Sequence, residues 1–129
     1  MKAVTLILGM LSFVCFSGGI ANDLEVYNDA GLNFTLYLNG QKVNEVAKDK
    51  VVLTNTGLDI VHARVVFEDQ SLPMIEKKYL MINFPWSSAE GNHPTTTVFK
   101  IKIKNGKYRL KKESRVYKPQ GSHEELIFI

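Results

Sequence analysis

The chain has 129 residues, of which 45% are hydrophobic and 22% charged, with a formal net charge of +3 at pH 7. No internal repeat or low-complexity stretch is present, which excludes a repeat architecture and leaves one domain with a single core as the expectation. The only cysteine is Cys15, so a disulfide-rich scaffold is excluded.

The first residues predict an export signal. Lys2 supplies the positive start, an apolar run from Ala3 to Phe16 follows, and Ser17–Ala21 supplies the small residues that a signal peptidase requires. The run is shorter than the ~20 residues of a membrane-spanning helix, so an uncleaved anchor is the less favoured alternative. Cleavage after Ala21 would leave residues 22–129 as the mature domain. That domain has no cysteine, which favours bacterial export to the periplasm or cell surface.

Alternation of apolar and polar residues predicts strands along most of the remaining chain, whereas no helical periodicity occurs. Val61, Ala63, Val65 and Phe67 are expected on a buried face. Pro73 and Pro85 place Ser71–Glu76 and Pro85–Pro94 in connections, the first with room for one helical turn. The expected strands are residues 24–27, 50–54, 61–67, 80–84, 126–129 and the flanks of two Asn-Gly pairs. About eight short strands predict an all-β fold, an antiparallel β-sandwich or a barrel-like domain.

The two Asn-Gly pairs, Asn39-Gly40 and Asn105-Gly106, predict two-residue hairpin turns, since this dipeptide tolerates the positive φ angles of a type I′ turn. The register that follows from the second turn places Ile103 opposite Tyr108 and Ile101 opposite Leu110 on one face. The other face then carries only cations, in the cross-strand pairs Lys104 with Lys107, Lys102 with Arg109, and Lys100 with Lys111.

Several runs of residues resemble a family of uncharacterised secreted β domains from Bacteroidota, over about Leu24 to Val116. They are Phe34–Gly40 with Asn44, Ala63–Pro73 with Ile75 and Lys77, Val98–Lys102, and Gly106–Leu110. The resemblance implies export in a Gram-negative bacterium and a β fold. It implies no activity, so no residue receives a role from it.

Charge is strongly separated along the chain. Residues 100–118 contain nine cations and one acid, Glu113, whereas residues 22–99 contain six cations and ten acids. Like charges directly opposite on a sheet repel. Three arrangements would relieve this repulsion. Water and salt would screen it, acids such as Glu68 and Asp69 would pair with the cations, or an external anion would bind to the cations. The external anion would be an acidic glycan or lipopolysaccharide of the envelope. Nucleic acid is not an expected partner, because no stacking aromatics interleave on that face.

Two further segments have alternative interpretations. Trp86 either fills the edge of the core, which is the usual place for a tryptophan, or stacks on a sugar ring. Leu126–Ile129 either complete this domain's own sheet or add to the sheet edge of another envelope protein.

No catalytic constellation is recognisable, and no cofactor or metal is expected. His62, His93 and His123 lie on separate segments without the spacing of a zinc site, and no nucleophile elbow or phosphate-binding loop occurs. The expected function is an exported binding or structural module rather than an enzyme. The alternatives are a small hydrolase acting on envelope glycan, with two converging acids, and a subunit of a protein assembly.

Overall fold

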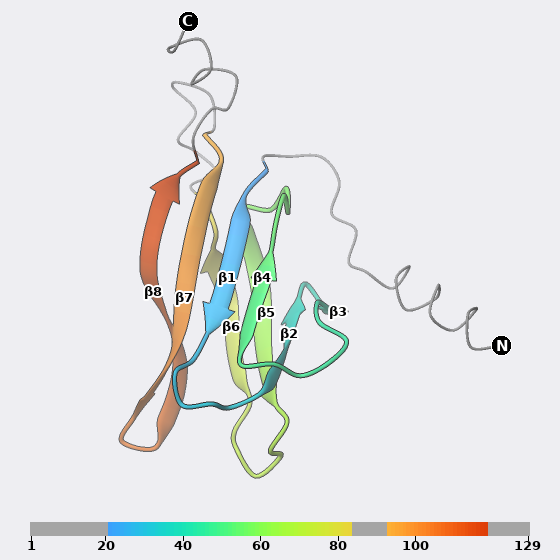
Figure 1. The fold of residues 1–129 in the computed structure, drawn as a ribbon, viewed down its shortest axis with the longest axis vertical. Helices are drawn as coiled ribbons and strands as arrows, with labels where there is room; N and C mark the ends of the chain where they lie inside the picture. Colours follow the sequence, from blue (N-terminus) through green and yellow to red (C-terminus); the bar gives the residue numbers. More distant parts are fainter. Residues whose placement is uncertain (1–20, 84–92, 119–129) are drawn as a thin grey trace, which may run out of the picture.

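The computed structural model describes residues 21–83 and 93–118, which form eight strands and no helix (Figure 1). The strands in chain order are β1 (Asp23–Tyr27), β2 (Phe34–Leu38), β3 (Gln41–Lys42), β4 (Lys50–Leu53), β5 (Ile60–Phe67), β6 (Ile75–Met81), β7 (Thr95–Lys104) and β8 (Lys107–Tyr117). The expected all-β fold is confirmed.

The strands form two four-stranded sheets, with the orders β4-β1-β7-β8 and β3-β2-β5-β6. Across residues 21–83 and 93–118 both sheets stay open, so the described fold is sandwich-like rather than barrel-like. One pair differs from the antiparallel expectation, because β1 runs parallel to β7. Parallel neighbours need a long crossover connection, and here most of the chain lies between the two strands. No local sequence signal reports such a pairing.

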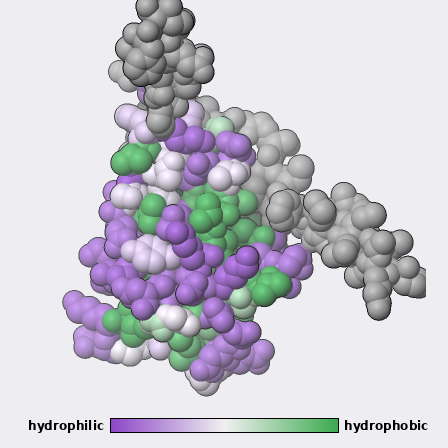
Figure 2. All heavy atoms as spheres, in the orientation of Figure 1, coloured by the Kyte–Doolittle hydropathy of each residue, from purple (hydrophilic) through white to green (hydrophobic). Residues whose placement is uncertain are grey.

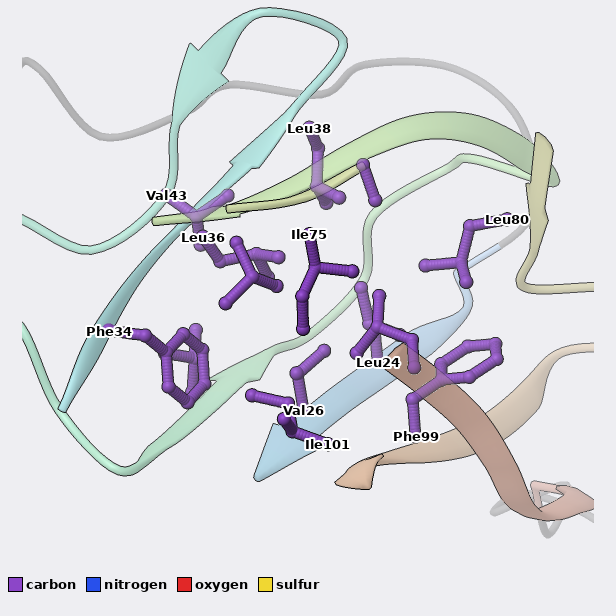
Figure 3. Close-up of a cluster of buried hydrophobic side chains, with 14 of the residues drawn as sticks. Leu24, Val26, Phe34, Leu36, Leu38, Val43, Ile75, Leu80, Phe99 and Ile101 are labelled. Carbon is purple, nitrogen blue, oxygen red and sulfur yellow. The ribbon is translucent and has the colours of Figure 1, made fainter. Parts of the chain in front are cut away.

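Apolar side chains from both sheets meet in one core (Figure 3). Phe34, Leu36 and Leu38 of β2 are fully buried, and they lie across from Leu24 and Val26 of β1. The predicted inward face of β5 is confirmed, since Val61, Ala63, Val65 and Phe67 are all at most 2% exposed. Period-two alternation therefore directs these side chains into the core.

Both Asn-Gly pairs form the predicted two-residue turns. Asn39 and Gly40 have φ angles of 51° and 83°, and Asn105 and Gly106 have φ angles of 53° and 75°. The first turn joins β2 to β3 and the second joins β7 to β8. Positive φ at both central positions is the geometry of a type I′ hairpin.

A bulge explains why β6 differs from its predicted bounds. The expected strand was residues 80–84, but β6 begins at Ile75 and ends at Met81, so Ile75 and Glu76 belong to it rather than to the preceding connection. Val65 faces Ile75 and Val61 faces Leu80, so β6 has one residue more than β5 between these pairs. The extra residue breaks the alternation that would have revealed the strand. The expected helical turn within Ser71–Glu76 does not occur; a hydrogen-bonded turn lies before it instead, in which Leu72 N donates to Asp69 O at 3.0 Å.

A second bulge lies in β8. Phe99 faces Lys112 whereas Val98 faces Ser114, which leaves Glu113 as the additional residue. Beyond the bulge, the pairing of β7 with β8 continues to Thr95 and Tyr117.

A polar cluster is buried at the end of the sandwich where β1 and β7 begin. Asn22 is fully buried, and its amide donates to Leu58 O at 2.8 Å and accepts from Thr95 N and Asn83 Nδ2 at 3.0 Å. Thr97 donates to Ile82 O at 2.7 Å and accepts from Arg115 Nε at 3.1 Å. We call Asn22, Asn83, Thr95, Thr97 and Arg115 the polar cluster. It connects the first sheet to the chain that leaves β6.

Some predictions fall outside the described residues. These concern the signal peptide up to residue 20, Phe84, Trp86, most of the 85–94 connection, His123 and the strand at 126–129. They stay predictions.

Candidate anion-binding surface

The β7–β8 hairpin has the cross-strand register that the sequence predicts. Lys104 faces Lys107, Lys102 faces Arg109 and Lys100 faces Lys111, while Ile103 faces Tyr108 and Ile101 faces Leu110. Ile101 and Leu110 are buried, so the cations lie on the outer face of the sheet. Figure 1 shows this hairpin at the end of the sandwich opposite to the start of β1.

Lys100 differs from the other five cations because the fold supplies its counter-ion. Its Nζ lies 2.8 Å from a carboxylate oxygen of Asp29 and 5.9 Å from the ring centroid of Tyr27. The hydrogen bond between Lys100 and Asp29 lowers the pKa of the Asp29 carboxyl and raises the pKa of the Lys100 ammonium. Lys100 is therefore a structural cation rather than an open binding group.

The loop between β1 and β2 positions Asp29. The Asn28 side chain is nearly buried, accepts from Ala30 N and Leu32 N at 3.0 Å, and donates to Leu32 O at 2.7 Å. A side chain that bonds to its own loop in this way fixes the loop conformation. Asp29 is consequently held beside β7.

The bulge residue Glu113 provides a second contact on the same face. The Tyr27 hydroxyl donates a hydrogen bond to the Glu113 carboxylate, which lies across β7 from β1. This hydrogen bond raises the pKa of the Tyr27 phenol. Thus Glu113, the only acid in residues 100–118, is also used within the fold.

Glu68 and Asp69, which the sequence suggested as partners for the hairpin, bond elsewhere. Glu68 accepts from Asn33 at 3.2 Å, and Asp69 accepts from the Ser71 hydroxyl at 2.6 Å, which lowers the pKa of Asp69. Among the described residues, Asp29 is the only acid that forms an ion pair with one of the six predicted hairpin cations.

Four of the predicted cations line a common hollow on the outer face of the hairpin. The hollow has a volume of about 280 Å³ and is lined by Lys102, Ile103, Lys104, Arg109 and Lys111. These four cations form no ion pair with any residue in the described part of the chain. Lys107, the sixth predicted cation, is exposed beside the turn and does not line the hollow.

A larger groove, of about 620 Å³, lies between β6 and β8 on the open side of the sandwich. Met74, Ile75, Tyr108 and Leu110 contribute apolar surface, and Lys77, Arg109, Lys111 and Lys112 contribute charge. Tyr108 is fixed by an edge-to-face contact with Phe67, with ring centroids 5.4 Å apart. Arg109 and Lys111 line both the hollow and the groove, so the two are continuous around β8.

The sequence interpretation missed Lys77 and Lys112 as members of the site. Lys77 faces Ala63 and Lys112 faces Phe99, so both occupy register positions on the core side of their sheets. Both nevertheless stay exposed, because β6 and β8 are edge strands. Only the inter-sheet geometry brings them to one groove. We call Lys77, Lys102, Lys104, Arg109, Lys111 and Lys112 the cationic surface.

The one acid in the groove, Glu76, is bound to a neighbouring strand. Its carboxylate lies 2.6 Å from His62 Nε2, and this hydrogen bond lowers the pKa of Glu76. The contact lies on the outer face of the second sheet. On the same face, the guanidinium carbon of Arg64 lies 4.9 Å from the centroid of the Tyr37 ring. Glu76 therefore leaves the charge of the cationic surface largely uncompensated.

Figure 2 shows hydrophobic side chains interleaved with hydrophilic ones over the lower part of the face that it displays.

In the described residues no group of three histidine, cysteine or acidic side chains is arranged to hold a metal. Nor does the described part of the chain contain a helix with the length and apolar character needed to cross a membrane.

Comparison with protein-family models, with curated proteins and with solved structures finds no match to this chain. Membership of the Bacteroidota family therefore stays a prediction.

Proposed function

We propose that this protein is exported to the bacterial envelope, to the periplasm or the cell surface, and binds an acidic polymer there through the cationic surface. The observation that carries the proposal is the register of β7 and β8, which places Lys102 opposite Arg109 and Lys104 opposite Lys107 without acids between them. Acidic polymers of that location include acidic glycans, lipopolysaccharide and acidic segments of other envelope proteins.

The energetics favour a ligand over a purely structural use of these charges. Directly opposed like charges on a sheet cost on the order of 0.2–1 kcal/mol per pair, because the side chains are held close together. The fold offsets this cost at Lys100, where Asp29 is 2.8 Å away, but no acid of the described residues forms an ion pair with the other two pairs, although the charge of Lys102 also lowers the pKa of Asp29. An external anion would relieve the repulsion at the positions where the fold does not.

Binding is supported better than hydrolysis of a glycan. A glycosidase mechanism needs two carboxyl groups that flank one bond. The groove contains one acid, Glu76, and the hollow contains none. The further hollow beside Val43–Leu53 on the other side of the sandwich also contains one acid, Glu45.

A matched pair of double variants tests the proposal. Lys102→Glu with Lys104→Glu reverses two members of the cationic surface, whereas Lys42→Glu with Lys48→Glu makes the same change in net charge on β3 and the following loop. Binding to polygalacturonate, measured by calorimetry over a salt series, should weaken at least about tenfold in the first variant and much less in the second. Affinity of the unaltered protein should fall as salt rises, because screening weakens exposed charges.

Equal affinities for the two variants, or affinity that salt leaves unchanged, would contradict the proposal. Neutral dextran is the control ligand, and binding to it at similar strength would also contradict a role for charge.

A further inference from the structure

The outer edge of β8 pairs with no other strand in the described part of the chain, although Arg115 of β8 donates a hydrogen bond to Met81 O at the end of β6. β8 is eleven residues long and is the last strand in its sheet, with β7 on its other side. The pair that closes a two-residue hairpin is hydrogen-bonded, and bonded and non-bonded pairs then alternate along the ladder. The backbone N–H and C=O groups of Tyr108 and Leu110 therefore point away from β7.

Charged and apolar surface lies on both faces of this edge. The outer face presents the hollow with Lys102 and Lys104, and the inner face presents the groove with Lys77, Lys112 and Met74. Arg109 and Lys111, which line both, are themselves residues of β8. A ligand that occupies both sites must pass along the edge of β8.

We infer that the acidic polymer is a polypeptide, an extended acidic segment of a partner protein that pairs with β8 as an additional strand. This inference rests on the proposed function and specifies its ligand. An added strand satisfies the edge backbone groups and directs alternate side chains to the two faces. Acidic side chains would enter the outer hollow, and apolar ones would contact Tyr108 and Met74 in the groove.

A glycan meets fewer of these requirements. It offers anionic groups to Lys102 and Arg109, but it lacks a regular series of amide donors and acceptors to match the strand edge. The peptide also fits the partly apolar lining of the groove, to which the buried Ile75 and Leu110 and the exposed Met74 contribute.

Lysines on an edge strand normally prevent pairing with another copy of the same strand. Here the same residues would make the edge selective. A second β8 would bring Arg109 and Lys111 against like charges, whereas an acidic strand would bring opposite charges. The cations thus exclude self-association and admit a complementary partner.

Three synthetic peptides test the inference against full-length mature protein. Each has about nine residues of alternating glutamate and valine, a length suited to one strand. One is unmodified, and the other two carry N-methyl groups on one or the other set of alternate residues. Only alternate residues of an added strand bond to its neighbour, so one methylated peptide should bind like the unmodified peptide and the other at least about tenfold more weakly. All three have the same charge.

The outcomes separate this inference from the proposed function. Equal binding of all three peptides, or binding of polygalacturonate without any peptide, would overturn strand addition while leaving an anion-binding surface in place. Absence of binding by both the peptides and polygalacturonate would overturn both.

Discussion

The two ends of the sandwich use polar residues in opposite ways. At the end where β1 and β7 begin, Asn22 and Thr97 are fully buried, and their side chains bond to backbone and side-chain groups across the two sheets. At the hairpin end, Lys102 and Lys104 are exposed and form no ion pair with an acid among the described residues. A buried polar group must be bonded or it destabilises the fold, whereas an exposed charge is free to bind a ligand.

This contrast predicts that substitutions at the two ends separate stability from binding. The polar cluster should control stability with little effect on the ligand, and the cationic surface should do the reverse. Four measurements test this, ordered from the largest expected effect on stability to the smallest.

Replacement of Asn22 should have the largest effect. Asn22→Ala removes the side-chain partner of Leu58 O and of Thr95 N inside the protein, and one of the two acceptors of Asn83 Nδ2, which also donates to His93 O. Buried groups left unpaired cost about 1–3 kcal/mol each, and partial rehydration reduces the sum, so we expect a loss of about 3 kcal/mol in urea unfolding. Asn33→Ala, which removes one exposed bond to Glu68, is the control and should change stability by less than about 0.5 kcal/mol. Similar values for the two would contradict the role of the polar cluster.

A pair of neighbouring threonines on β7 gives a second comparison. Thr97→Val removes the donor to Ile82 O and the acceptor for Arg115 Nε without changing side-chain shape, so stability should fall by about 1–2 kcal/mol. Thr96→Val makes the same change on the outer face of the sheet and should alter stability by less than about 0.5 kcal/mol. Thermal or urea unfolding distinguishes them. If Thr96→Val is the more damaging, the assignment of the two faces is wrong.

At the hairpin, charge reversal should increase stability while it decreases binding. Lys104→Glu places a carboxylate opposite Lys107, which replaces repulsion by attraction and should add about 0.2–1 kcal/mol to the free energy of unfolding. Affinity for polygalacturonate should fall in the same variant. Lys104→Gln should lie between the two in both measurements. A loss of stability in Lys104→Glu would show that Lys104 and Lys107 do not destabilise the hairpin by repulsion.

The smallest effect concerns pH and the one paired cation. Lys100 lowers the pKa of Asp29, so the pair stabilises the protein above the usual carboxyl pKa of about 4 and loses this contribution as pH falls through the lowered value. Asp29→Asn should therefore lower the urea midpoint at neutral pH and reduce its decline below about pH 4. Lys48→Gln is a control on an exposed lysine away from the hairpin. If the urea midpoint of Asp29→Asn falls below pH 4 as steeply as that of the unaltered protein, the ion pair of Lys100 with Asp29 does not contribute to stability.

Local features of the sequence determined several parts of this structure. The two Asn-Gly turns, the inward face of β5 and the cross-strand register of the β7–β8 hairpin depend on interactions between residues close in sequence, so pattern and turn chemistry are sufficient to predict them. The positions of Lys102, Lys104, Arg109 and Lys111 on one face follow from the same register.

Only the tertiary structure decided the remainder. The parallel pairing of β1 with β7, the bulges in β6 and β8, and the ion pair of Lys100 with Asp29 each depend on which distant segments become neighbours. The inclusion of Lys77 and Lys112 in the cationic surface has the same origin, because those residues come from different sheets. Alternation along a strand assigns side chains to its two faces, but the packing of the sheets decides what each face contacts.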